Sequence, residues 1–295
     1  MNIISGTTLA KEIKANLATE ISTMTAQCGR APKIALVLVG EDPASASYVR
    51  SKGKTSAELG IESDTRHLPE DIDQETLLDI IDELNKDTTV DAILVQLPLP
   101  KHIDTTTILN AIDYRKDVDG LHPVNVGKFS CGEEAITPCT PRGILSLLRY
   151  GQVEIAGKHA VVVGRSNLVG KPTALLLLRE NATVTLCHSH SQNLAELVKQ
   201  ADILVLAMGC PDVVTPDMLK QDVVVVDVAM NYVDDKLCGD LYMQRNLPAL
   251  ETKATAITPV PGGVGPMTIT SLMQNVFEIY AATQSSSTPT PQAEL

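Results

Sequence analysis

Short hydrophobic runs alternate with segments of helical periodicity along the first part of the chain. The apolar runs cover residues 34–39 and 90–97, and the helical segments cover residues 43–59 and 75–85. Alternating strands and helices predict an α/β fold with a parallel sheet. Asp42 and Pro43 predict the start of the first helix, because the carboxylate caps free N–H groups and proline has none to lose.

The same alternation resumes after Gly157 and predicts a second series of strands and helices. Its apolar runs cover residues 159–164, 183–187, 203–207 and 223–228, its helical segments cover 171–180 and 193–200, and a short helix follows Thr215-Pro216. Between the two series, residues 114–141 lack clear periodicity. Thr140-Pro141 then shows the same pattern of a capping residue before proline, so we expect a helix and a domain boundary there.

The end of the chain predicts one more helix. Residues 269–282 carry apolar side chains at helical spacing, after a stretch at 259–268 too rich in proline and glycine for regular structure. The tail is rich in Ser, Thr, Pro and Gln, which is typical of disorder. The expected division is 1–140 and 141–267, with a helix at 268–283 and a disordered tail at 284–295.

Composition narrows the class of protein. The 295 residues are 44% hydrophobic and 20% charged, which predicts a soluble globular chain of about two domains. The net charge of −12 argues against a broad nucleic-acid or anionic-membrane surface and favours small-molecule ligands. Aromatic residues make up 3% of the chain, so we expect a core of Val, Ile, Leu and Ala, as in buried parallel strands.

Targeting and cysteine patterns indicate the cytoplasm. Lys11, Glu12 and Lys14 interrupt the apolar stretch that a signal peptide needs, and no apolar window reaches the roughly 18 residues of a membrane helix. The six cysteines form no C-x-x-C pair and no zinc-ligand spacing, so we expect reduced thiols.

A glycine-containing turn at residues 164–172 lies between an apolar strand and an apolar helix. Backbone amides in such a turn can bind a phosphate group. The turn has two glycines where the standard dinucleotide fingerprint has three, so its spacing fits an ordinary turn about as well.

The next strand ends in His188-Ser189-His190-Ser191, where an NAD enzyme would place an acidic residue on the ribose. NADP is therefore the preferred cofactor, since Ser189 can donate to a 2′-phosphate and Arg165 can supply the countercharge. A solvated loop is the alternative interpretation. A metal site at the two histidines lacks a third ligand at suitable spacing.

Candidate chemistry in the first half comes from three places. Tyr48 and Lys52 share a helix face, which is often only a surface pair, although a lysine in a pocket can move protons. Gln96 ends a buried strand, at the edge where open α/β sheets bind ligands. The loop at 116–123 adds Asp117 and Asp119, and spacing does not choose between the two carboxylates.

These segments resemble the bifunctional bacterial type of the methylenetetrahydrofolate dehydrogenase/methenyltetrahydrofolate cyclohydrolase family. The resemblance covers nearly the whole chain, from Gly40 to the helix after Thr268. The matching segments are residues 39–45, 48–52, 95–100, 116–120, 137–143, 164–172 and 259–268.

The resemblance implies a fold, a cofactor and an assembly. It implies two α/β domains around a cleft: an N-terminal αβα domain that binds folate and a C-terminal Rossmann-like domain that binds NADP. It also implies that the last helix returns to the first domain, that the protein is a homodimer, and that it serves one-carbon metabolism and purine biosynthesis.

The resemblance also implies roles for single residues. Lys52 matches the catalytic lysine, Gln96 the amide that holds it, Tyr48 the aromatic side chain that packs on the folate, and Asp119 the pterin-binding carboxylate. The cofactor-binding positions are Gly164, Arg165, Ser166, Ser189 and Gly209, and the wall shared by cofactor and substrate is Pro261, Gly262 and Gly263. One departure stands after Asp227: Val228-Ala229-Met230-Asn231 replaces the usual Gly-Ile-Asn, which would reshape the nicotinamide end of the cleft.

The implied reaction has two steps. A hydride leaves 5,10-methylene-tetrahydrofolate for NADP without a general base, because the substrate nitrogens stabilise the cation. Water then attacks the methenyl carbon, and a neutral Lys52 held by Gln96 manages the protons that open the ring to 10-formyl-tetrahydrofolate. The alternatives are another NADP-dependent dehydrogenase, of amino-acid or shikimate type, and a non-catalytic NADP-binding regulatory protein.

Overall fold

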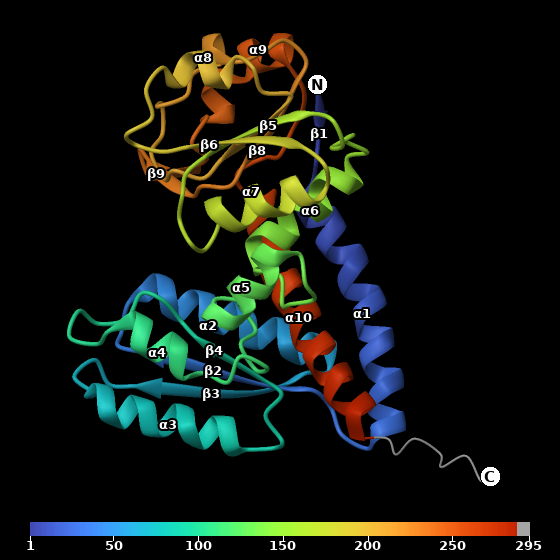
Figure 1. The fold of residues 1–295 in the computed structure, drawn as a ribbon, viewed down its shortest axis with the longest axis vertical. Coiled ribbons are helices and arrows are strands. Elements are labelled where there is room, and N and C mark those ends of the chain that lie inside the picture. Colours follow the sequence, from blue (N-terminus) through green and yellow to red (C-terminus); the bar gives the residue numbers. More distant parts are fainter. Residues whose placement is uncertain (288–295) are drawn as a thin grey trace. The chain divides into compact units, whose positions relative to one another are not determined.

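The computed structural model describes residues 1–287, with side chains to residue 284. Contacts divide the chain into two units (Figure 1). Unit 1 comprises residues 1–13 and 138–271, and unit 2 comprises residues 14–137 and the chain from Leu272 onward. The chain passes from one unit to the other inside α1 (Gly6–Cys28), at Thr137, and inside α10 (Val264–Ser287).

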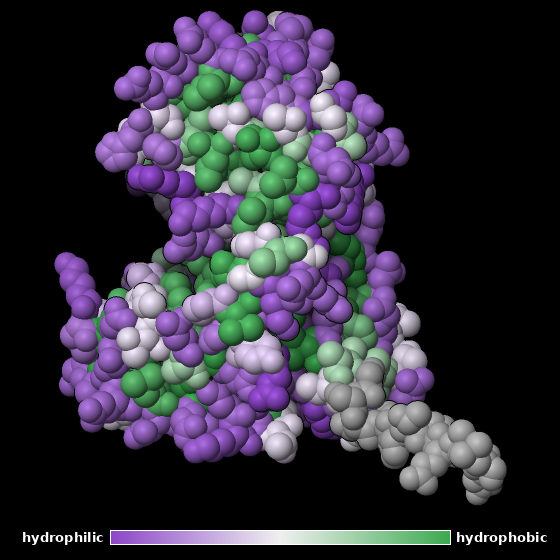
Figure 2. All heavy atoms as spheres, viewed as in Figure 1, coloured by the Kyte–Doolittle hydropathy of each residue, from purple (hydrophilic) through white to green (hydrophobic). Residues whose placement is uncertain are grey.

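Unit 2 contains a three-stranded parallel sheet in the order β3-β2-β4. Its strands are β2 (Lys33–Val39), β3 (Glu62–Leu68) and β4 (Ala92–Val95), and its helices are α2 (Pro43–Leu59), α3 (Gln74–Lys86), α4 (Thr105–Ala111) and α5 (Pro123–Cys131). Helix α3 buries Leu77, Ile81 and Leu84 against this sheet, and hydrophilic side chains cover most of its outer face (Figure 2). The predicted strands and helices at 34–39, 43–59, 75–85 and 90–97 are confirmed, with small shifts at their ends.

Unit 1 contains a six-stranded parallel sheet in the order β1-β11-β8-β7-β5-β6. Its strands are β1 (Asn2–Ile3), β5 (His159–Val163), β6 (Thr183–Cys187), β7 (Ile203–Leu206), β8 (Val223–Asp227) and β11 (Ala254–Ile257). Its other elements are α6 (Cys139–Tyr150), α7 (Gly170–Arg179), α8 (Leu194–Val198), the 3₁₀ turn η1 (Pro216–Met218), α9 (Met243–Lys253) and the hairpin of β9 (Asn231–Val233) and β10 (Lys236–Cys238). The second predicted series is therefore confirmed.

The start of the chain adds an edge strand that periodicity did not predict. Strand β1 pairs in parallel with β11, with Asn2 opposite Ala256 and Ile3 opposite Ile257. A strand of two residues has too few positions to show an alternating pattern, so only the tertiary structure identifies it.

The cap predicted at Thr140 and the predicted start of the last helix were wrong. Helix α6 begins at Cys139 without a side-chain cap, and the Thr140 hydroxyl lies 3.1 Å from that of Thr268 instead. Helix α10 begins at Val264, inside the stretch expected to be a loop, and continues to Ser287. Residues 284–287 are thus helical, and the rest of the expected disordered tail, 288–295, lies outside the described residues.

Buried aliphatic side chains form the core of each unit. Val161, Val225 and Leu204 are fully buried in unit 1, as are Ile34 and Leu36 in unit 2. None of the helices in the described part of the chain is long and apolar enough to cross a membrane.

Candidate functional site

Each sheet has a point where the chain reverses its direction across the sheet. In unit 2 the chain runs from β2 to β3 on one side and then to β4 on the other. In unit 1 it runs from β5 to β6 on one side and then to β7 on the other. Loops diverge at such a switch point and leave a crevice at the carboxyl ends of the strands, which is where open α/β sheets bind ligands.

The switch point of unit 2 brings Lys52 and Gln96 together. Lys52 Nζ donates to Gln96 Oε1 at 2.9 Å, across 44 residues of sequence. Gln96 Nε2 donates to the carbonyl of Leu97 at 2.7 Å, and this second bond turns the amide oxygen toward the lysine. Both side chains are half-buried, so the amine is held in place and still reachable from solvent.

Local sequence explains why α2 presents Lys52 at this point. Asp42 accepts from the backbone N–H of Ser45 at 2.8 Å, and these bonds lower the pKa of the Asp42 carboxyl. The predicted cap is therefore confirmed. Farther along α2, Ser56 is fully buried and donates to the Lys52 carbonyl at 3.0 Å.

Two other side chains on α2, those of Tyr48 and Lys54, differ in their surroundings. Tyr48 is 38% exposed and shares the face of Lys52 by its spacing. Lys54, two residues after Lys52, is 79% exposed and lies 3.9 Å from Glu58. Lys54 is thus a solvent-exposed lysine on the helix that also carries Lys52.

The structure separates the two carboxylates that spacing left open. Asp117 is 3% exposed and accepts from His122 N and Asn125 Nδ2, each at 2.8 Å. Burial raises the pKa of Asp117, which marks it as an internal group of the loop. Asp119 is more exposed than Asp117 and therefore better placed to meet a ligand.

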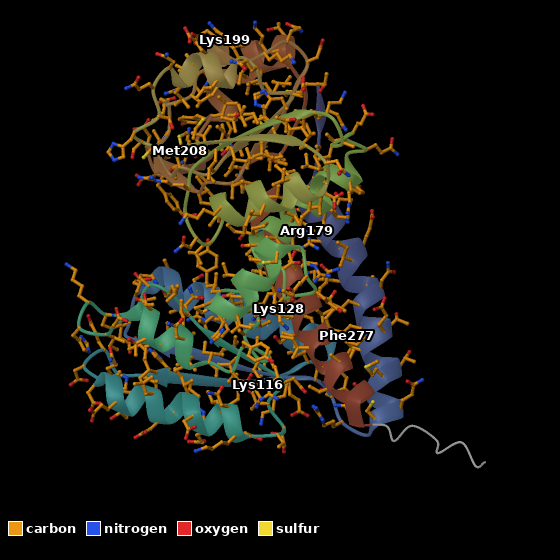
Figure 3. All side chains as sticks on the ribbon, viewed as in Figure 1. Lys116, Lys128, Arg179, Lys199, Met208 and Phe277 are labelled. Atoms are coloured by element: carbon orange, nitrogen blue, oxygen red, sulfur yellow. The ribbon has the colours of Figure 1, made fainter. Side chains whose placement is uncertain are left out.

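Two supports of this loop were not predicted. The Lys116 ammonium donates to the carbonyls of Leu84 and Asp87 at the end of α3, and burial lowers the pKa of this lysine (Figure 3). Asn275, fully buried on α10, donates to the carbonyls of Val118 and Thr137, each at 2.9 Å. The contacts of Lys116 span 32 and 29 residues and those of Asn275 span 157 and 138, and contacts at such separations leave no local signal in the sequence.

The glycine turn of unit 1 lies at the second switch point. A Cβ on Gly164 would lie 2.3 Å from the carbonyl oxygen of Ala207, and a Cβ on Gly170 would lie 1.9 Å from that of Gly164. Two glycines are therefore required for the turn to pack against the end of β7. Ser166 accepts from the backbone N–H of Val169 at 3.1 Å, which stabilises the start of α7.

The turn after β6 lies beside the glycine turn. Val163 and Cys187 are register partners, so the loops of Arg165 and Ser189 leave the sheet at the same edge. Ser191 accepts from the backbone N–H of His188 and shapes the turn, whereas Ser189 and Arg165 are exposed. Among the described residues no group of three His, Cys, Asp or Glu side chains is arranged to hold a metal ion.

Gly209 follows β7 at the same switch point, with φ of 68°. The N–H groups of Met208, Gly209 and Cys210 all point at the carboxylate of Asp240, at 2.8, 3.3 and 2.9 Å. Asp240 was not predicted from the sequence, since nothing in its spacing marks a buried carboxylate.

The Pro261-Gly262-Gly263 loop is tied to two other segments of unit 1. The carbonyl of Gly262 accepts from the backbone N–H of Thr7 at 3.0 Å, and Gln244 donates to the carbonyl of Val260 at 2.6 Å. A Cβ on Gly263 would lie 2.5 Å from the carbonyl oxygen of Pro259. The structure therefore holds this loop closely and requires glycine in it.

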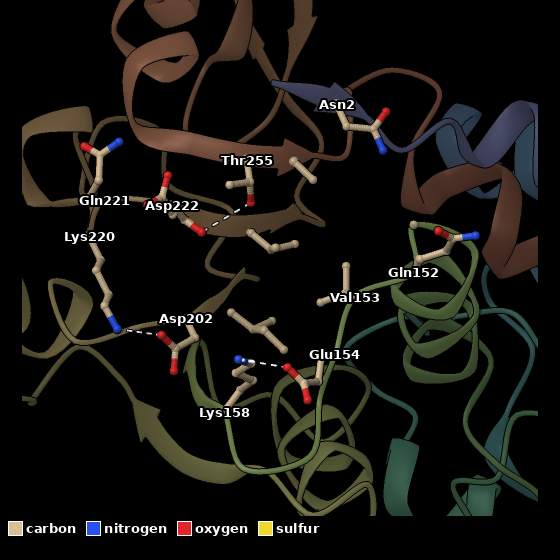
Figure 4. A pocket seen from close by; sticks show the side chains of 14 residues that line it. Asn2, Gln152, Val153, Glu154, Lys158, Asp202, Lys220, Gln221, Asp222 and Thr255 are labelled. Carbon is tan, nitrogen blue, oxygen red and sulfur yellow. Dashed lines mark hydrogen bonds and ion pairs between the residues drawn. The ribbon is translucent and has the colours of Figure 1, made fainter.

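A separate cavity of about 560 Å³ lies at the amino ends of the unit 1 strands (Figure 4). Its two lysines are already engaged: Lys158 lies 3.0 Å from Glu154, and Lys220 lies 2.5 Å from Asp202. This cavity is on the opposite edge from the switch point and both of its lysines are paired with carboxylates, so we do not assign the function to it.

Family models match both parts of the chain. Residues 4–119 match the catalytic domain of tetrahydrofolate dehydrogenase/cyclohydrolase, and residues 138–284 match the NAD(P)-binding domain of the same family. The bifunctional protein FolD of Exiguobacterium sibiricum is 50% identical over 276 residues, which cover 94% of this chain and 98% of the relative.

Solved structures agree with this assignment. The bifunctional FolD enzyme of Campylobacter jejuni is 42% identical with a TM-score of 0.93, and the match covers 96% of this chain and 99% of that one. The Trypanosoma brucei FolD enzyme, complexed with NADP and an inhibitor, is 36% identical with a TM-score of 0.91, covering 97% and 98%. A shikimate dehydrogenase of Thermus thermophilus, 14% identical with a TM-score of 0.52, shares the fold alone. The chain belongs to the tetrahydrofolate dehydrogenase/cyclohydrolase family.

Proposed function

We propose that this chain oxidises 5,10-methylene-tetrahydrofolate to 5,10-methenyl-tetrahydrofolate with NADP, and hydrolyses that product to 10-formyl-tetrahydrofolate. The observation that carries the proposal is the bond between Lys52 and Gln96 at the unit 2 switch point, in a chain that also matches the family's NAD(P)-binding domain. A protein that only bound the cofactor would have no use for this pair.

In the first step the chain binds and orients NADP and 5,10-methylene-tetrahydrofolate. Bound NADP supplies the acceptor for the hydride, and no protein base is needed because the substrate nitrogens stabilise the positive charge. The glycine turn of unit 1 fits a dinucleotide, because it leads from β5 into the first turn of α7, where backbone N–H groups can bind a phosphate, and Ser166 stabilises this helix start.

In the second step Lys52 manages the protons. A neutral amine can donate one N–H to Gln96 Oε1 and keep its lone pair for a proton of the attacking water. The water oxygen bonds to the methenyl carbon, the bond from that carbon to N5 breaks, N5 takes one proton and a second is released. Gln96 is the residue that orients Lys52 for this transfer.

The remaining site residues bind ligands in this proposal. Tyr48 packs on the folate and Asp119 binds the pterin, consistent with the exposure of Tyr48 and with the internal role of Asp117. Gly209 contacts the cofactor. Pro261, Gly262 and Gly263 form a wall for cofactor and substrate, consistent with a loop anchored by Thr7 and Gln244.

Specificity for NADP over NAD rests on Arg165 and Ser189. Both are exposed beside the paired ends of β5 and β6, and no acidic residue occupies the turn at 188–191. A guanidinium and a hydroxyl can bind a 2′-phosphate, whereas a carboxylate at this place would repel it.

The protein is also proposed to be a cytoplasmic homodimer that supplies 10-formyl-tetrahydrofolate to purine biosynthesis. Support for the dimer comes from β6, which ends the six-stranded sheet and has no strand on its outer edge among the described residues. Leu186 on β6 is 36% exposed and Leu178 on α7 is 57% exposed. An open strand edge beside exposed leucines favours association with a second copy. Light scattering would test this, with Leu186→Lys expected to yield monomers.

The test of the proposed function is a paired assay on the purified chain. With NADP and 5,10-methylene-tetrahydrofolate, the absorbance of NADPH is expected to rise. With 5,10-methenyl-tetrahydrofolate and no NADP, the methenyl absorbance is expected to decay faster than in buffer. Absence of the first signal would refute the dehydrogenase, and absence of the second would refute the cyclohydrolase.

A further inference from the structure

A fully buried carboxylate, Asp240, lies behind the loop that follows β7. Its two oxygens accept from the backbone N–H groups of Met208, Gly209 and Cys210, and from Asn231 Nδ2 at 3.0 Å. Four donors therefore converge on one side chain. Because N–H groups surround both oxygens, the carboxylate is committed to holding backbone and is not placed to bind a cation.

Three consecutive N–H groups pointing at one carboxylate define the conformation of residues 208–210. Bonds from N–H groups to an ionised acceptor are stronger than those between neutral groups. Ala207 precedes this segment, and its carbonyl oxygen lies so close to Gly164 that no side chain fits at position 164. Asp240 thus holds the partner surface of the glycine turn at the unit 1 switch point.

A second buried carboxylate connects Asp240 to the proline- and glycine-rich loop. Asp227 accepts from the backbone N–H groups of Asp240 and Leu241, each at 2.9 Å. The backbone N–H of Asp227 donates to the hydroxyl of Thr258, also at 2.9 Å, one residue before Pro259. A Cβ on Gly239 would lie 2.1 Å from Asp227 Oδ2, so this position requires glycine.

We propose that Asp240 is a positioning residue for NADP: it holds residues 208–210 in the conformation that binds the cofactor, and Asp227 joins this support to the loop at 259–263. This inference rests on the proposed function, because it takes Gly209 as a cofactor contact. It goes beyond that function by assigning cofactor affinity to a side chain that does not touch the cofactor.

The experiment compares Asp240→Asn with Asp202→Asn. Asparagine keeps the shape of Asp240 but loses the charge and one acceptor, so the loop loses N–H partners. The KM for NADP is expected to rise ~10-fold or more, by the loss of hydrogen bonds to a charged group. Hydrolysis of methenyl-tetrahydrofolate without NADP is expected to keep its kcat, since the pair that moves the protons, Lys52 and Gln96, lies in unit 2.

Asp202 is the matched control. It belongs to the same unit and accepts from the backbone N–H of His159 at 2.9 Å, but it lies at the opposite edge of the sheet, in the cavity at the strands' amino ends. Asp202→Asn is expected to leave the KM for NADP unchanged. An equal rise in the KM for NADP of Asp240→Asn and Asp202→Asn would mean that any lost hydrogen bond weakens the whole of unit 1, and it would overturn the assignment.

A milder variant keeps the test decisive if Asp240→Asn does not fold. Asn231→Ala removes one of the four donors and leaves the carboxylate in place, so the KM for NADP is expected to rise ~2- to 5-fold. Unchanged KM in every folded variant would refute the role of Asp240. Failure of the wild-type chain to reduce NADP would instead refute the proposed dehydrogenase, so the two failures are distinguishable.

Discussion

The two switch points present different kinds of chemical group. At the switch point of unit 2, two side chains meet, because Lys52 donates to Gln96. Asp119 adds a carboxylate from the same loop as Asp117. At the one in unit 1, close-packed glycine turns present mainly backbone atoms, supported from behind by Asp240, with the exposed side chains of Arg165 and Ser189 beside them. Proton transfer needs a titratable side chain, whereas phosphate binding needs N–H groups in a fixed arrangement.

This difference separates the effects that mutations should have. A side chain in unit 2 can be replaced with little change in backbone, so its loss should remove one step of the reaction. A change in the glycine turn or its supports moves backbone, so its loss should weaken cofactor binding. The four predictions that follow test this separation.

The largest effect is expected for Lys52→Met. Methionine keeps the length of the side chain but has no proton to transfer, so hydrolysis of methenyl-tetrahydrofolate should fall ~10²- to 10⁴-fold. The matched control is Lys54→Met, two residues away and solvent-exposed, which should keep full hydrolysis. Full hydrolysis by Lys52→Met would remove the lysine from the mechanism.

The next effect is expected for Gly164→Ala. Its methyl group would enter the space occupied by the Ala207 carbonyl, and its φ of 127° is unfavourable for any side chain. The free energy of unfolding should fall by about 1–3 kcal/mol, and the KM for NADP should rise at least ~10-fold. Titration with NADP and urea denaturation measure the two effects.

Gly127→Ala is the control for this prediction. Gly127 lies in α5, and a Cβ there would meet nothing within 4 Å. This variant should bind NADP like the wild type. If Gly164→Ala also bound NADP normally, the close packing of the glycine turn would have no part in cofactor binding.

A smaller effect is expected for Arg165→Gln. Loss of the guanidinium should raise the KM for NADP ~5- to 10-fold and leave that for NAD nearly unchanged, because only NADP carries the 2′-phosphate. Lys158→Gln removes a positive charge from the opposite edge of the same sheet and should change neither constant. An equal rise with both nucleotides would place Arg165 away from the 2′-phosphate.

The smallest effect concerns pH and Asp227. Burial, with a minor contribution from the charge of Asp240, raises the pKa of Asp227 from 3.8 to about 7. The folded state therefore favours the protonated carboxyl, and this contribution to stability is lost as pH rises through 7. Between pH 6 and 8 the free energy of unfolding of the wild type should fall by about 1 kcal/mol relative to Asp227→Asn.

The titratable groups whose charges interact with Asp227 are Cys238 and Asp240. Burial raises the pKa of the Cys238 thiol. That thiol remains protonated across this pH range, so it does not obscure the titration of Asp227. Urea denaturation of both proteins at several pH values provides the measurement. If the difference in the free energy of unfolding between wild type and Asp227→Asn stayed constant from pH 6 to 8, the titration of Asp227 in this range would be contradicted.

The same contrast explains what the sequence could predict. The cap at Asp42, the shared face of Tyr48 and Lys52, and the position of Gln96 at a strand end follow from local rules of helix and strand geometry. The bond between Lys52 and Gln96 then needs only the parallel order of β2 and β4, which the alternating pattern implies.

The supports of the site follow from contacts that no local pattern encodes. The Asp240 carboxylate accepts from Gly209 and Cys210, 31 and 30 positions away, and Asn275 meets Val118 and Thr137 across 157 and 138 positions. A buried Asp in an apolar segment has the same local sequence whether it holds a loop or lies on the surface. Only the folded backbone distinguishes these cases.

One measurement tests most directly whether the two steps of the reaction use different residues. Lys52→Met is mixed with 5,10-methylene-tetrahydrofolate and NADP, and all products are quantified over time. The proposed mechanism predicts NADPH and 5,10-methenyl-tetrahydrofolate in equal amounts, with little 10-formyl-tetrahydrofolate, whereas the wild type forms NADPH and 10-formyl-tetrahydrofolate. Formation of 10-formyl-tetrahydrofolate by the variant at the wild-type rate would contradict it.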